Sequence, residues 1–185
     1  MNDIELDKEL EQQFLAINSD WEEWQNKAQS LRRAALVIRK EAQRDWDDWK
    51  LKHCTTTPDE YQLPPSLVGT MTFLNGLAIE NLVKALLIKK NGSISKNDFT
   101  HKITDLFEKV NFELSGEEKD YIDRLRCFVE WAGRYPTPTN FTEFRPKELS
   151  CGIKVQQFYT DFICDESLIF ELIRKLEIML RLKDM

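Results

Sequence analysis

Residues 78–92 read AIENLVKALLIKKNG, and this stretch decides how the chain folds. At about 100° per residue, its apolar side chains surround a helix on nearly every side, which is typical of a helix buried inside a bundle. The paired lysines and the Asn-Gly that follow favour a helix C-terminus with a left-handed stop. We therefore predict a central core helix over residues 66–90.

Three polar residues interrupt the apolar faces of this helix: Glu80, Asn81 and Lys84. Glu80 precedes Lys84 by one turn, which suits an ion pair. Two interpretations remain open at this point: an exposed pair on a ridge between grooves, or a polar centre that lines a cleft or a dimer seam. In the second case each buried charge needs a partner, or its pKa must move.

Helical spacing of apolar residues extends to most of the chain. The predicted helices outside the core helix cover residues 3–17, 21–52, 100–110, 116–132 and 167–182. Ser115 and Glu118 form a capping-box pattern at the start of one of them. Residues 133–150 have no clear period and are predicted to form a loop of functional length. Three interpretations stay open for residues 151–164: irregular, strand-like or a helical turn. Four tryptophans, at positions 21, 24, 46 and 49, are expected to pack between helices rather than to stack on a ligand.

These patterns predict one all-α domain over residues 1–185, an up-and-down bundle of five or six helices. Its core is expected at about residues 66–183, with the helices over 3–17 and 21–52 packed on it. The 185 residues carry a formal net charge of −6, so the surface as a whole does not indicate nucleic-acid binding. The basic stretch that stands out is residues 84–102, which contain five lysines and one acidic residue.

The composition also indicates the cellular compartment of the protein and argues against certain cofactors. The chain has four cysteines without a C-x-x-C pair and only two histidines, which argues against a structural zinc site and for reduced thiols. The acidic start lacks the pattern of a secretory signal, and uninterrupted apolar runs are too short for a membrane span. We expect a cytoplasmic protein that needs no membrane, no metal and no cofactor.

Three further residues are candidates for a site. His101 is predicted within the first turn of the 100–110 helix, where a structural role is more common than a catalytic one. Arg134 follows the helix that ends near Ala132, and its guanidinium suits a carboxylate or a phosphate. Tyr135, beside it, could stack on a base or clamp the loop to the bundle.

Taken in order, these segments resemble the HEPN (higher eukaryotes and prokaryotes nucleotide-binding) superfamily, in particular its prokaryotic members. The resemblance rests on LNGLAIENLVKALLI, FTHKITDLFEKV and WAGRYPTP, and covers about residues 66–140. The positions that carry it are Gly76, Ala78, Glu80 and Lys84 in the first segment, His101 and Leu106 in the second, and Arg134, Tyr135 and Pro136 in the third.

The resemblance implies a helical bundle of four or five helices that is often a homodimer. Many members are metal-independent ribonucleases of toxin–antitoxin or phage-defence systems, and others bind nucleotides, RNA or a partner protein without catalysis. Active members carry an arginine followed, after four to six residues, by a histidine. This chain lacks that pattern, because eight residues separate Arg44 from His53 and no arginine lies between Arg44 and His101.

Two functions are therefore expected, the first above the second. The first is a non-catalytic module that binds a nucleotide or partner through Glu80, Asn81, Lys84, Arg134 and Tyr135, with a second copy, RNA, a nucleotide or an antitoxin as partner. The second is a divergent metal-independent endoribonuclease. It would use Arg134 with His101 or Glu80, because RNA cleavage needs a proton acceptor and a cation for the phosphorane charge.

Overall fold

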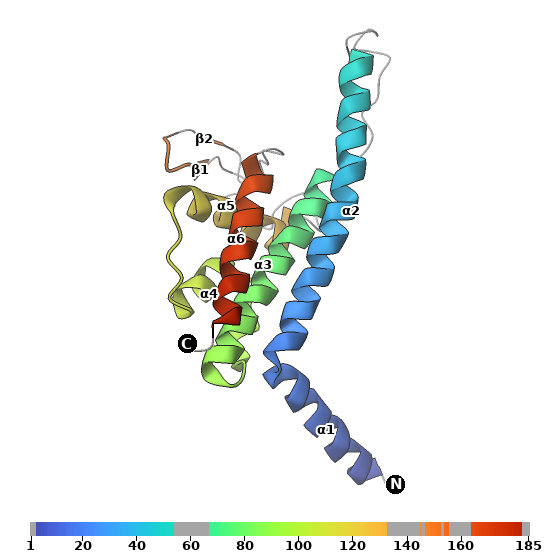
Figure 1. The fold of residues 1–185 in the computed structure, drawn as a ribbon, viewed down its shortest axis with the longest axis vertical. Helices are drawn as coiled ribbons and strands as arrows, with labels where there is room; N and C mark the ends of the chain where they lie inside the picture. Colours follow the sequence, from blue (N-terminus) through green and yellow to red (C-terminus); the bar gives the residue numbers. More distant parts are fainter. Residues whose placement is uncertain are drawn as a thin grey trace.

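The computed structural model describes residues 3–53, 67–132, 145, 147–152, 154–155 and 164–182. Over these ranges the chain is an all-α helical bundle, as the sequence predicts (Figure 1). Its helices are α1 (Asp3–Ser19), α2 (Trp21–His53), α3 (Val68–Asn91), η2 (Lys96–Asp98), α4 (Ile103–Lys109), α5 (Gly116–Cys127), η3 (Phe128–Ala132) and α6 (Cys164–Arg181). Two two-residue strands, β1 (Lys147–Glu148) and β2 (Lys154–Val155), pair antiparallel.

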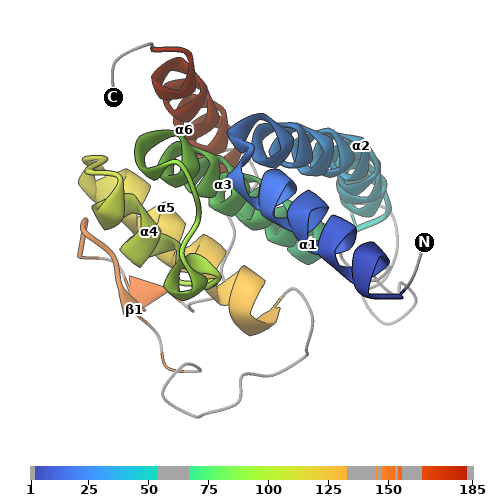
Figure 2. The same ribbon diagram turned by 90° about the horizontal axis from the view of Figure 1, so that it is seen from below.

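The core is built around α3, which contacts α2, α4, α5, η3 and α6. Seen from below, α3 lies in the middle of the bundle (Figure 2). Its residues Leu82–Ile88 are all buried. It ends as predicted, at Asn91, and Gly92 adopts the left-handed conformation with φ of 78°. By length and composition α3 could also cross a membrane, but 78% of its apolar window is buried in the bundle, which is equally typical of a soluble core helix.

Local signals fix several of the other boundaries. The Ser115–Glu118 capping box forms as predicted and opens α5. Ile103 and Leu106 are fully buried in α4 and anchor it to the core. The helix after Ser115 does not stay α-helical to its end, because η3 is a π-helix. Such wide turns are uncommon and often lie near functional sites.

The prediction that residues 3–17 pack on the core is wrong. The described side chains of α1, from Asp7 to Ile17, are exposed, and α1 extends away from the bundle (Figure 1). Asp20 interrupts the helix, and its carboxylate caps α2 by accepting from the Glu22 backbone N–H at 2.9 Å. The chain changes direction there, so α2 packs along α3 whereas α1 does not.

The tryptophan prediction is confirmed for Trp21 and Trp24. Trp21 and Trp24 are partly buried against the core. Trp46 is 48% exposed, because α2 continues past the bundle at its C-terminal end (Figure 1). The side chain of Trp49 lies outside the described residues.

Candidate functional site

Glu80 and Lys84 form an ion pair inside the bundle. Lys84 Nζ donates to Glu80 Oε1 at 2.7 Å, and each residue is only 4% exposed. The exposed-ridge interpretation is therefore wrong, whereas the polar centre at a cleft or dimer seam stays a prediction. A buried charge without a partner is costly, so the two side chains stabilise each other at this depth.

His101 is the third member of this centre. Its Nδ1 lies 2.9 Å from Glu80 Oε2, and its side chain is 51% exposed. Because an ionised carboxylate only accepts, Nδ1 carries the proton of this hydrogen bond. His101 does not lie within a helix as predicted: it precedes α4, in the segment that returns from the end of α3. Both oxygens of Glu80 are thus occupied, one by Lys84 and one by His101.

The segment that carries His101 is held in place by its own hydrogen bonds. The left-handed Gly92 turns the chain out of α3. Ser95 and Asp98 form a capping box around η2, and Lys109 from α4 pairs with Asp98. The hydrogen bond from Lys109 lowers the pKa of Asp98, and those from Ser95 lower it further. The course of residues 92–102 places His101 beside Glu80 although 21 residues separate them in sequence.

Two aromatic rings lie beside the buried amine. Lys84 Nζ is 5.7 Å from the centroid of the Trp24 ring and 5.9 Å from that of Phe99. The two rings contact each other, with centroids 6.0 Å apart. Cations near aromatic faces are stabilised by the ring quadrupole, more so when they are desolvated. Phe99 remains 53% exposed, so this pair of rings reaches from the interior to the surface next to His101.

The other predicted site residues do not join this centre. The Asn81 side chain donates to the carbonyl of Leu77 in its own helix at 2.7 Å. Arg134 and Tyr135 lie outside the described residues. Of the predicted site, the structure therefore brings together Glu80, Lys84 and His101.

Sequence reasoning missed a second polar network, at the end of the bundle where α6 begins. Arg32 of α2 donates to Asn75 of α3 at 2.9 Å and to Glu166 of α6 at 2.6 Å. Arg124 of α5 pairs with Asp165, the neighbour of Glu166. The partners in these contacts are 41 to 134 residues apart in sequence, so no local motif could indicate them.

Tyr121 lies beside this network and is 1% exposed. Burial raises the pKa of its phenol, and the charge of Asp165 raises it further. The phenol therefore stays protonated, and the network ties four helices together without offering a nucleophile. Its role is structural.

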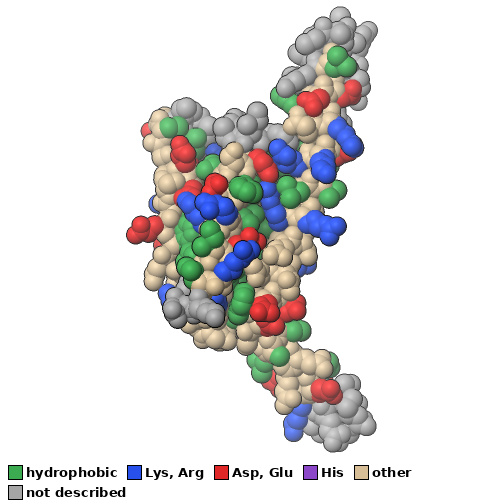
Figure 3. Space-filling view, in the orientation of Figure 1, with side chains coloured by type: hydrophobic (Ala, Val, Ile, Leu, Met, Phe, Trp, Pro, Cys, Tyr) green, Lys and Arg blue, Asp and Glu red, His purple; other side chains and the backbone are tan. Residues whose placement is uncertain are grey.

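Helix α2 carries a second basic stretch that is visible in the sequence. Residues 27–44 contain six basic residues and one acidic residue, a stronger bias than the stretch over 84–102. Their spacing places several of them on one helix face, which the structure confirms as exposed on α2 (Figure 3). The description of residues 84–102 as the outstanding basic stretch is thus corrected.

The described residues contain no group of three His, Cys, Asp or Glu side chains that could hold a metal ion. The chemistry available at the centre is that of a carboxylate-held histidine beside an aromatic ring and several lysines. Comparison with protein-family models, with curated proteins and with solved structures gave no match for this chain.

Proposed function

We propose that this chain is a HEPN-like, non-catalytic module that binds a nucleotide or single-stranded RNA. The binding surface is the 96–102 edge, defined as Lys96, Phe99, His101 and Lys102. All four are exposed, and they lie on one short segment. The single observation that carries the proposal is the half-exposed Phe99 ring between exposed lysines, because aromatic rings stack on bases and lysines attract phosphates.

The buried ion pair supports this edge but does not face a ligand. Lys84 contributes its charge beneath Phe99, at 5.9 Å from the ring centroid. Glu80 fixes the imidazole of His101 at 2.9 Å, so the ring presents Nε2 without having to be ordered by the ligand. Within this proposal, Glu80 and Lys84 hold the edge in its binding conformation, and Phe99, His101 and the lysines contact the nucleotide.

The occupancy of Glu80 favours binding over catalysis. A general base must reach the proton that it removes. Glu80 is 4% exposed and both of its oxygens already accept hydrogen bonds, so it cannot reach a ribose hydroxyl. A cellular role in a toxin–antitoxin or phage-defence system, with a cognate antitoxin as partner, is the corresponding expectation from the family resemblance.

Binding is tested with a labelled single-stranded RNA by fluorescence anisotropy and with ATP by calorimetry. Phe99→Ala should weaken RNA binding about tenfold, since stacking contributes about 1–3 kcal/mol per base. Phe170→Ala is the matched control, because Phe170 is 60% exposed on α6, far along the chain from this edge. If neither ligand binds, or if both alanine variants bind as the wild type does, the proposed edge is wrong.

The alternative function is a divergent metal-independent endoribonuclease. The Glu80–His101 contact favours it, because a carboxylate that holds Nδ1 leaves Nε2 free to accept or donate a proton in the way of a general acid–base. Arg134 would then stabilise the phosphorane charge. Cleavage of RNA in EDTA that is lost in both His101→Ala and Arg134→Ala would establish this function and displace the first.

A further inference from the structure

Helix α1 carries an apolar face that has no partner in the described part of its own chain. The exposed fractions are 52% for Leu10, 62% for Phe14, 55% for Leu15 and 59% for Ile17. Isolated helices of this length are only marginally stable in water, and helices in proteins derive most of their stability from packing. A 17-residue helix with four exposed large apolar side chains therefore needs a surface to pack on.

The apolar face of α1 continues the packing seam of α2. Leu10, Phe14 and Ile17 are spaced by four and three residues, and the same alternation continues through Trp21, Trp24, Ala28, Leu31, Ala35, Ile38 and Ala42. This is the spacing of residues that pack helix against helix. In α2 the seam is covered by α3 of the same chain, with Ala28 and Ala35 almost fully buried. In α1 the residues at the corresponding positions are exposed.

The opposite face of α2 offers a matching surface, which we call the α2 outer stripe: Arg33, Leu36, Val37, Lys40 and Arg44. At about 100° per residue, four of these positions lie on the side of α2 that faces away from buried Ala28 and Ala35, and Leu36 lies at the edge of that side. All five are exposed, and Val37 is 64% exposed. Figure 3 shows Lys and Arg side chains interspersed with hydrophobic ones along α2.

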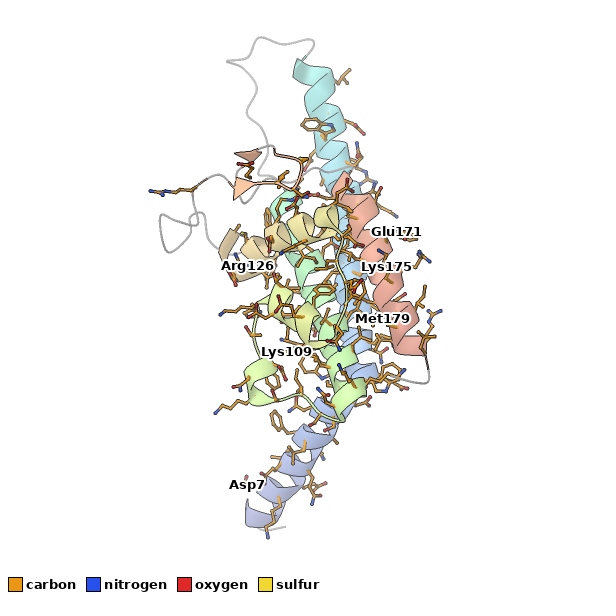
Figure 4. The ribbon with its side chains drawn as sticks, turned by 90° about the vertical axis from the view of Figure 1, so that its left-hand side faces the viewer. Asp7, Lys109, Arg126, Glu171, Lys175 and Met179 are labelled. Atoms are coloured by element: carbon orange, nitrogen blue, oxygen red, sulfur yellow. The ribbon has the colours of Figure 1, made fainter. Side chains whose placement is uncertain are left out.

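The charges of α1 and of the α2 outer stripe are opposite. Residues 3–11 of α1 contain five acidic residues and one lysine. The α2 outer stripe contains three basic residues and no acidic one, although Arg44 pairs with nearby Glu41 at 2.8 Å. Figure 4 shows Asp7 on the part of α1 that extends beyond the bundle, so α1 of the same chain leads away from α2. The surface that α1 complements is therefore within reach on a second copy.

We propose that α1 of one copy packs antiparallel on the α2 outer stripe of a second copy, so that two chains exchange their N-terminal helices. When Phe14 is set opposite Leu36 of the partner chain, the equal rise of both helices sets Leu10 opposite Lys40 and Ile17 opposite Arg33. In this register Phe14 meets the apolar centre of the stripe, and Leu10 and Ile17 pack on the hydrocarbon stems of Lys40 and Arg33. The acidic N-terminal half of α1 meets its basic end, near Arg44.

Two-fold symmetry makes the arrangement self-consistent. The contact of α1 with the partner's α2 occurs twice in one dimer, since each chain has both surfaces. Each contact spans about 15 Å, the length of ten residues of helix. The dimer contact does not include the 96–102 edge. This proposal therefore goes beyond nucleotide binding and is tested separately from it.

A charge-exchange experiment tests the proposal by sedimentation analysis of the full chain. Variant one carries Asp7→Lys and Glu11→Lys, and variant two carries Lys40→Glu and Arg44→Glu. Each should shift the wild-type dimer towards the mass of one chain, because like charges then face each other in both contacts. An equimolar mixture should regain the mass of two chains, since each contact again joins opposite charges.

The matched control reverses two exposed charges away from the stripe, Lys119→Glu and Arg181→Glu, and should leave the dimer intact. Raising the salt concentration should weaken the wild-type dimer, because exposed charges are screened. A wild type with the mass of one chain, or a mixture that does not associate, overturns the proposal. So does a variant two that stays dimeric but loses affinity for single-stranded RNA, because the stripe would then be a nucleic-acid surface.

Discussion

Replacing Gly76 by alanine tests the packing of α3 against η3. A Cβ at this position would lie 2.5 Å from Val129 Cγ2 and 3.4 Å from the Leu125 carbonyl oxygen. The first distance is about 1 Å inside an ordinary contact between carbon atoms. The second distance is to backbone, which restricts the direction in which α3 could shift to relieve the clash.

The expected magnitude follows from two opposing effects. Overpacking costs about 1–3 kcal/mol, and we expect the upper end because the overlap is large. Replacing glycine by alanine within a helix gains about 1 kcal/mol. We therefore expect Gly76→Ala to lower the free energy of unfolding by about 2 kcal/mol, and Tm by about 4–8 °C for a chain of this size.

The assay is urea unfolding followed by far-UV circular dichroism, with a control on the same helix. At Gly69 an added Cβ would meet Phe128 at an ordinary 3.7 Å, so Gly69→Ala should be neutral or stabilising by up to about 1 kcal/mol. Adding Val129→Ala to Gly76→Ala should reveal a favourable coupling, because the clashing methyl group is removed. A Gly76→Ala variant at least as stable as the wild type would refute this account of the α3–η3 contact.

Three further predictions concern charged side chains and the contacts that hold them. Glu80→Gln should lower the free energy of unfolding by about 3–5 kcal/mol, because buried Lys84 loses its counter-charge, and adding Lys84→Met should recover part of that loss in urea titrations. The pKa of Asp98 is lowered in the folded state by the hydrogen bond from Lys109, so its contribution to stability is present above the unfolded pKa of about 4 and is lost as pH falls below it. Unfolding midpoints measured between neutral and acidic pH should therefore fall less steeply for Asp98→Asn than for the wild type. Lys89→Met should speed hydrogen exchange in the last turn of α6, because the amine donates to two carbonyl groups there, whereas exchange in α5 should not change.

Much of the fold could be predicted because its determinants are local. The apolar residues around the central helix, the Asn91-Gly92 stop and the Ser115–Glu118 box each act within a few residues. The position of α1 could not be predicted in this way. Its helical spacing is correct, but a periodic pattern shows only that a helix has a packing face and does not show what covers that face.

The candidate site was predictable in its members but not in its geometry. Helical spacing alone pairs Glu80 with Lys84, one turn apart. The contact between Glu80 and His101 depends on how the chain turns after Gly92, and the depth of the pair depends on Trp24 from another helix. The Arg32 network was missed because its partners come from distant parts of the sequence.

The π-helical turn of η3 makes this part of the bundle tolerant of a change in the number of residues. A π turn closes its hydrogen bond over one residue more than an α turn does. Deleting one residue between Phe128 and Ala132 would therefore let α5 run on as a regular α-helix with the phase of its faces nearly unchanged. The same deletion inside a regular helix such as α3 would rotate everything beyond it by about 100°. In this short stretch the loss of one residue should disturb the packing less than it would in any regular helix of the bundle.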